Sequence, residues 1–179
     1  MTIMPIGEPG DVYAIRTGGK AAGLIRFGSG LLGKPNLSNH IAVVHHVTGS
    51  TKWAIEGKPG GVGWVDCARY AQSPYLLTNV EQPKTSVQRS LICATLEGML
   101  GTPYDWPGIA QDALADLHLP DLWAEKWGGV TPGHVVCSSL AAWAYAKGGC
   151  AAPKTADMAH IQPSDWDEFI LTKAWELAA

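Results

Sequence analysis

The sequence predicts an α+β fold in one domain, residues 1–179, because strand patterns fill its first half and helix patterns its second. The chain has 179 residues, a usual length for one domain and enough to bury a hydrophobic core without disulfides or metals. Apolar residues make up 46% of the chain and charged residues 16%, so a disordered chain is excluded.

The strands are predicted from apolar runs bounded by turn residues. The clearest run is 40–47, and the turn residues 48–51 and a second run at 52–56 complete the pattern of a β-hairpin. Other features expected in this half are, in order, a strand at 12–16, a short helix at 21–32 interrupted by glycines, a Gly/Pro-rich loop at 57–63, and strands at 62–65 and 75–80.

The helices are predicted from apolar residues that recur three and four positions apart. Four are expected, at 86–100, 111–117, 136–147 and 163–168. The third follows a break at Thr131-Pro132-Gly133 and ends at Gly148-Gly149, a pair of residues typical of a helix C-terminus.

Charge and hydropathy exclude several functions. The formal charge is −3, from 13 Lys plus Arg and 16 Asp plus Glu, and no basic block argues for a nucleic-acid partner. The longest apolar run, 140–146, is far shorter than the ~18 residues of a membrane span, so no integral membrane segment is expected. The N-terminus lacks the features of a signal peptide, so we expect a soluble protein made in the cytoplasm. Release by phage lysis or packaging into a virion would leave no mark on the sequence.

One of the four cysteines stands in a position that favours reactivity. Cys67, Cys93, Cys137 and Cys150 form no CxxC pair or zinc pattern, so we expect free thiols and neither metal nor cofactor. Cys137 begins the helix expected at 136–147, where unpaired N–H groups and the positive end of the dipole favour a thiolate. The same N–H groups can receive the oxyanion of an acyl intermediate. The other three cysteines are assigned to packing.

A nucleophilic cysteine needs a base, and histidine is the usual one near neutral pH. His40 opens the clearest strand at a loop boundary, where an imidazole can be both rigid and accessible. A zinc enzyme that uses His40, His45 or His46 is a weaker alternative, because neighbouring residues on a strand point to opposite faces.

The base is normally oriented by a third polar group, for which Glu56 at the end of the partner strand is the candidate. Side chains alternate between the two faces along a strand, so the register of the hairpin decides whether His40 and Glu56 share a face. They do so only if the numbers of two residues that pair across the hairpin add up to an even value. A two-residue Gly49-Ser50 loop gives an odd sum and places Glu56 with His45. A three- or five-residue loop, or a bulge, gives the even sum, and the sequence leaves these possibilities open.

Several short motifs occur in an order that resembles a known family. They are GDVY (10–13), NHIAVV (39–44), WAIEG (53–57), GTPYDW (101–106), HVVCSSL (134–140) and IQPSDW (161–166). The chain resembles the circularly permuted NlpC-type papain-like cysteine hydrolases over about residues 10–166, with the histidine motif before the cysteine motif. The lecithin retinol acyltransferase group shares this permuted order.

The resemblance implies a permuted papain-like fold, in which an antiparallel sheet packs against helices. It implies Cys137 as nucleophile, His40 as base and Glu56 as the third member of a triad. Residues expected to contact substrate are Tyr104, near the mouth of the active site, and Asp11 and Tyr13 in the first motif. Many relatives carry an acid two residues after the nucleophile, where this chain has Ser139, and the Trp-rich loop 106–131 is expected to reshape the pocket.

The expected function is that of a cysteine peptidase or amidase, which cleaves an amide bond through an acyl-enzyme. Cell-wall peptide is the commonest target of the family, so peptidoglycan is the expected partner. Two alternatives stay open: a lipid or thioester acyl hydrolase or acyltransferase, and an inactive binding or structural module on the same fold.

Overall fold

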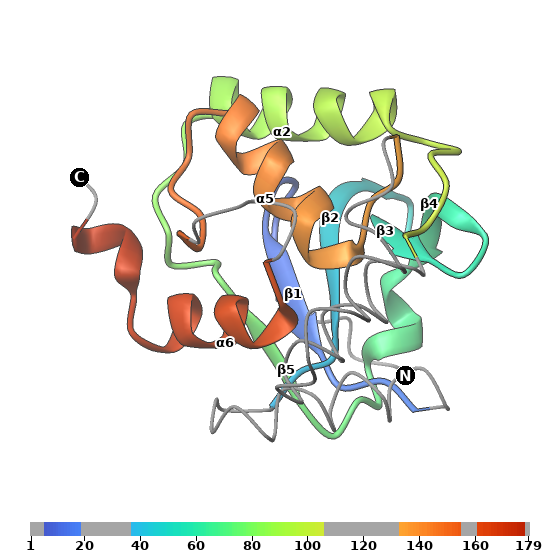
Figure 1. The fold of residues 1–179 in the computed structure, drawn as a ribbon, viewed down its shortest axis with the longest axis horizontal. Helices are drawn as coiled ribbons and strands as arrows, with labels where there is room; N and C mark the ends of the chain where they lie inside the picture. Colours follow the sequence, from blue (N-terminus) through green and yellow to red (C-terminus); the bar gives the residue numbers. More distant parts are fainter. Residues whose placement is uncertain (1–5, 19–36, 106–132, 155–160, 178–179) are drawn as a thin grey trace, which may run out of the picture.

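The computed structural model describes residues 6–18, 37–105, 133–154 and 161–177. Within them, five antiparallel strands form one sheet of order β4-β3-β2-β1-β5 (Figure 1). The strands are β1 (Val12–Ile15), β2 (His40–Thr48), β3 (Thr51–Lys58), β4 (Gly61–Asp66) and β5 (Leu76–Thr78). The helices are α2 (Ser86–Gly98), α5 (Cys137–Lys147) and α6 (Pro163–Leu171), with the short 3₁₀ helices η1 (Cys67–Tyr70) and η3 (Ala174–Leu177). The predicted α+β class is confirmed.

All five predicted strands are present, but the loop predicted at 57–63 is wrong. β3 continues to Lys58 and β4 begins at Gly61, so only Pro59 and Gly60 remain as a turn. The glycines in this stretch permit close approaches between backbones. A Cβ atom at Gly61 would lie 2.8 Å from the carbonyl oxygen of Thr102, and the backbone at Gly61 has a φ of +100°. The helices predicted at 21–32 and 111–117 lie outside the described residues.

The hairpin of β2 and β3 combines two features that the sequence left as alternatives. Thr48 pairs with Thr51 across the two-residue Gly49-Ser50 turn, which starts the hairpin in the odd register. The register then shifts between Val44 and His46, and from there Ala42 pairs with Glu56. This β-bulge converts the odd sum into the even one. Glu56 therefore shares a face of the sheet with Ala42 and with His40, two residues further along β2.

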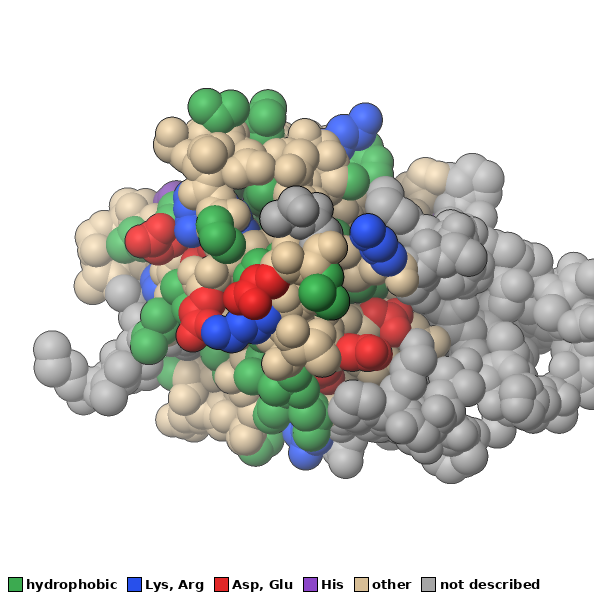
Figure 2. All heavy atoms as spheres, turned by 90° about the vertical axis from the view of Figure 1, so that its left-hand side faces the viewer, with side chains coloured by type: hydrophobic (Ala, Val, Ile, Leu, Met, Phe, Trp, Pro, Cys, Tyr) green, Lys and Arg blue, Asp and Glu red, His purple; other side chains and the backbone are tan. Residues whose placement is uncertain are grey.

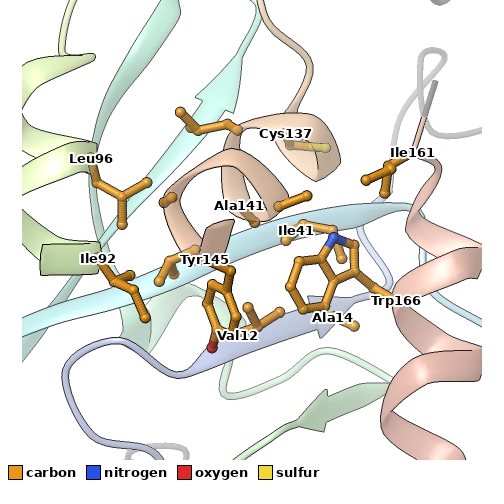
Figure 3. Close-up of a cluster of buried hydrophobic side chains, with 14 of the residues drawn as sticks. Val12, Ala14, Ile41, Ile92, Leu96, Cys137, Ala141, Tyr145, Ile161 and Trp166 are labelled. Atoms are coloured by element: carbon orange, nitrogen blue, oxygen red, sulfur yellow. The ribbon is translucent and has the colours of Figure 1, made fainter. Parts of the chain in front are cut away.

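Helix α5 covers one face of the sheet and packs against β2 and β3, while α2 lies beside α5 and α6 contacts β1 and β5 (Figure 1). The alanine-rich sequence of α5 lets this helix approach the strands closely, and seven of its residues are buried. Figure 3 shows Cys137 in the first turn of α5, and Tyr145 and Trp166 filling the space toward β1. The indole of Trp166 donates to the carbonyl of Ser138 at 3.1 Å, which ties α6 to the start of α5.

The opposite face of the sheet carries a second, smaller apolar cluster. It is covered by η1 and consists of Tyr13, Ile15, Ala42, Val44, Ala54, Val65, Cys67 and Tyr70.

On the side where α6 and η3 lie, acidic and basic side chains are intermingled (Figure 2), as in the ion pair of Lys173 with Glu81. No helix among the described residues has the length and apolar character that crossing a bilayer requires.

Truncating a core side chain of α5 should destabilise the protein. Leu140 is 1% exposed, so Leu140→Ala should lower the free energy of unfolding by about 2–5 kcal/mol. The matched control is Leu177→Ala in η3, where the side chain is 90% exposed and the change should stay below about 0.5 kcal/mol. Urea unfolding of both variants measures this, and equal losses at the two positions would contradict the described core.

Candidate active site

Cys137 is the first residue of α5 and is 3% exposed. Its sulfur is hydrogen-bonded to the imidazole of His40 and accepts from the backbone N–H of Ile41. The hydroxyl of Tyr104 lies 4.0 Å from the same sulfur. The thiol is thus surrounded by donors from β2 and from the segment around Tyr104.

These donors outweigh the effect of burial. Burial by itself raises the pKa of the Cys137 thiol, but the charge and hydrogen bond of His40, with the donors from Ile41 and Tyr104, bring the pKa below its usual value. The other three cysteines show burial without this compensation. Burial raises the pKa of Cys67 to about 12 and that of Cys93 to about 11, and it also raises the pKa of Cys150.

His40 stands between the sulfur and a carboxylate. Its Nε2 atom lies 2.5 Å from Oε2 of Glu56. Burial by itself would lower the pKa of His40, but the negative Cys137 and Glu56 on its two sides raise it to about 10. The imidazole is therefore held as an imidazolium, and its charge is what stabilises the thiolate.

Glu56 is buried, at 4% exposure, yet it is held as a carboxylate. Burial raises its pKa, and the hydrogen bonds from His40 and Tyr70 together with the positive charges of His40 and Lys58 bring the pKa below its ordinary value. Tyr70 donates its hydroxyl to Oε2, and Nζ of Lys58 lies 3.5 Å from Oε1. Each oxygen of the carboxylate thus has a cationic or hydrogen-bonding partner.

The β-bulge in β2 also changes how His45 and His46 lie. The expectation that they point to opposite faces is wrong, since their Nδ1 atoms are 3.0 Å apart and Nε2 of His45 faces Glu97 at 3.2 Å. The extra residue of the bulge interrupts the alternation of the strand. Among residues 6–18, 37–105, 133–154 and 161–177, no group of three metal-ligating side chains is assembled.

Tyr104 is brought to Cys137 by a segment that is hydrogen-bonded at both ends. The carbonyl of Thr102 accepts from the N–H of Val62 in β4 at 2.9 Å, and Tyr104 pairs with Val135 just before α5. The backbone N–H of Cys137 donates to the Tyr104 hydroxyl. Burial and the adjacent thiolate raise the pKa of Tyr104, so the phenol stays protonated.

Gly57 lets β3 pass directly behind the start of α5. A Cβ atom at this position would lie 3.2 Å from the backbone nitrogen of Cys137 and 3.3 Å from the ring of Tyr104. Those distances are tighter than ordinary van der Waals contact, so a side chain here would displace the groups around the sulfur.

Asp11 and Tyr13 are not brought to this site. Asp11 is fully buried and paired with Lys84 and Arg89, at 2.8 and 2.9 Å. Tyr13 is also fully buried, and its hydroxyl lies 3.5 Å from Nζ of Lys52. Neither side chain has a surface that a substrate could touch, so the expectation that they bind substrate is corrected to a role inside the fold.

Ser139, at the position where many members of the resembled family carry an acid, serves the helix instead. Its hydroxyl accepts from the backbone N–H of Val136 at 3.2 Å and donates to the carbonyl of the same residue at 3.1 Å, so it caps α5. The loop expected to reshape the pocket lies almost wholly outside the described residues.

Two features of the site were not predicted. Tyr70 follows β4 in a short 3₁₀ helix and carries no motif that marks it, so no sequence signal pointed to its contact with Glu56. The close approach at Gly57 had a signal, a glycine directly after the candidate acid inside a strand pattern, which indicates a backbone contact.

Cys137 should be alkylated faster than the other three cysteines at acidic pH. At about pH 6 a thiol of ordinary or raised pKa is almost entirely protonated, whereas the lowered pKa of Cys137 gives it a larger thiolate fraction than the other cysteines have. We expect iodoacetamide to label Cys137 first, as read by peptide mass spectrometry. Equal labelling of all four cysteines, or preferential labelling of the half-buried Cys93 and Cys150, would contradict the described electrostatics.

Comparison with known proteins adds no relative to this description. No family model, curated protein or solved structure matches the chain. The α+β class and the five-stranded antiparallel sheet follow from the strands and helices of the described residues.

Proposed function

We propose that the protein is a cysteine hydrolase that cleaves an amide or peptide bond through the thiolate of Cys137. One observation carries the proposal: of the four cysteines, Cys137 alone has a lowered pKa, and it owes this to a buried imidazolium in hydrogen-bond contact. The buried Cys67 and the half-buried Cys93 and Cys150 all have raised pKa values. The paired charges of Asp11, Lys84 and Arg89 hold parts of the fold together, whereas the group at Cys137 contains a thiolate, which is a nucleophile.

The proposed reaction uses the three residues in sequence. The sulfur of Cys137 attacks the carbonyl carbon and forms a tetrahedral oxyanion, while His40 holds the proton that the thiol has given up. His40 then donates this proton to the leaving amine as the C–N bond breaks, which leaves a thioester on Cys137. Water, deprotonated by the now neutral His40, hydrolyses the thioester and restores the thiolate–imidazolium pair. Glu56 stays ionised throughout and keeps the imidazole oriented.

The oxyanion would be received at the start of α5. The backbone N–H of Cys137 lies in the first turn of the helix, where such groups have no partner within the helix. The hydroxyl of Tyr104 accepts from this N–H and, as a protonated phenol, is itself a donor. A substrate oxyanion that replaced the Tyr104 hydroxyl as the acceptor of this N–H could take hydrogen bonds from both groups.

Peptidoglycan peptide as the substrate rests on the resemblance to NlpC-type enzymes and remains a prediction. The thiolate described above attacks thioesters and lipid acyl groups by the same chemistry, so the site alone does not select the acyl group. Assays of cell-wall fragments beside acyl thioesters separate the two substrate classes, and turnover of the thioester alone would reassign the substrate while leaving the mechanism intact.

Removing the sulfur should abolish turnover of whichever substrate is active. Cys137→Ala should lower kcat by more than about a thousandfold, because the nucleophile is lost while the backbone donors remain. Cys67→Ala is the matched control, since Cys67 is an equally buried free cysteine in the other apolar cluster. We expect it to lose a similar amount of stability and to keep its activity. Full activity in Cys137→Ala would end the proposal.

A further inference from the structure

We infer that Tyr70 is a positioning residue of this site: its hydroxyl fixes the Glu56 carboxylate against His40. The inference rests on the proposed function, because its importance depends on Cys137 acting as a nucleophile. The hydroxyl of Tyr70 contacts the carboxylate, and its ring lies near that of His40, with centroids 6.3 Å apart. The role inferred here is that of the hydroxyl, which would act through Glu56.

The geometry of the contact supports this role. Tyr70 donates to Oε2 of Glu56, the same oxygen that lies 2.5 Å from Nε2 of His40. Because two donors from different elements hold this one oxygen, the Glu56 carboxylate cannot rotate without losing one of the two hydrogen bonds. The remaining oxygen, Oε1, lies 3.5 Å from Lys58, which is 37% exposed, so Tyr70 and His40 supply the buried part of the carboxylate's environment.

Tyr70 is itself held firmly in place. It is the last residue of η1, which begins directly after β4 and is capped by Asp66 through a 2.8 Å hydrogen bond to the N–H of Ala68. Its ring is 4% exposed and belongs to the apolar cluster on that face of the sheet. Burial and the neighbouring Glu56 raise the pKa of the Tyr70 hydroxyl, so it stays protonated and can donate to the carboxylate near neutral pH.

A buried carboxylate is charged only when donors replace the water it has lost. Without the Tyr70 hydroxyl, the pKa of Glu56 would lie higher than it does with it, and the negative charge beside His40 would be lost at a higher pH. A neutral Glu56 no longer stabilises the imidazolium, and a neutral imidazole no longer stabilises the thiolate of Cys137. Loss of the Tyr70 hydroxyl, on the far side of the sheet, should thus make the thiolate of Cys137 less stable.

The test measures the alkylation rate of Cys137 by iodoacetamide as a function of pH, which needs no knowledge of the substrate. Tyr70→Phe removes the hydroxyl and keeps the ring in the apolar cluster. In this variant the acid limb of the rate–pH profile should move to higher pH, and labelling of Cys137 should be about tenfold slower at about pH 6. The expected effect is large because a hydrogen bond to a charged group is stronger than one between neutral groups. The matched control is Tyr13→Phe, the same change in the same cluster at a hydroxyl that lies near Lys52, and its profile should follow the wild type.

Two further variants separate positioning from a general structural effect. Glu56→Gln should shift the acid limb in the same direction as Tyr70→Phe, and the double variant should match Glu56→Gln alone, since Tyr70 acts through Glu56. Substituting 3-fluorotyrosine at position 70 makes the hydroxyl a stronger donor and keeps both the hydroxyl and the ring, and it should move the acid limb to lower pH. This variant keeps the inference testable if Tyr70→Phe does not fold.

The outcomes distinguish the two proposals. If the Tyr70→Phe profile coincides with the wild type while Glu56→Gln is shifted, Tyr70 has no positioning role and the proposed function stands. Additive shifts in the double variant would likewise overturn the inference. If wild-type Cys137 shows no preferential labelling at acidic pH, the proposed function itself fails.

Discussion

Three buried ionisable groups at one end of the sheet depend on one another for their charge. A thiol, an imidazole or a carboxylate placed alone in such surroundings would be neutral, because burial penalises the charged form. Here the imidazolium of His40 lies between Cys137 and Glu56, and burial is overcome at all three positions. The balance is therefore a property of the whole group, and removing one charge changes the protonation of the other two.

The backbone around the site serves this balance. The segment that carries Tyr104 is hydrogen-bonded to β4 at Val62 and to Val135 before α5, so it cannot move independently of either. Gly57 allows β3 to lie against the first turn of α5 without a side chain between them. Such fixed surroundings are what a preorganised site requires, because donors that must rearrange during a reaction lose much of their effect.

The site draws on both faces of the sheet. α5 presents the sulfur from the larger apolar cluster, while η1 presents the Tyr70 hydroxyl from the smaller one. His40, as the first residue of β2, lies at the end of a strand, and there a side chain from one face can meet a group from the other. With this arrangement, a residue in a short helix on the other face of the sheet would influence the thiol through Glu56 and His40.

Local patterns in the sequence were enough to predict the five strands, the helix that begins at Cys137 and the α+β class, because apolar periodicity and helix-stop residues act over a few positions. They also singled out Cys137 and His40 by their places at a helix start and a strand start. The pairing of Glu56 with His40 needed the bulge at His45, and the burial of Asp11 and Tyr13 depended on what packs around them. Register, burial and the contact of Tyr70 with Glu56 arise from segments far apart in the chain, and only the tertiary structure decides how such segments meet.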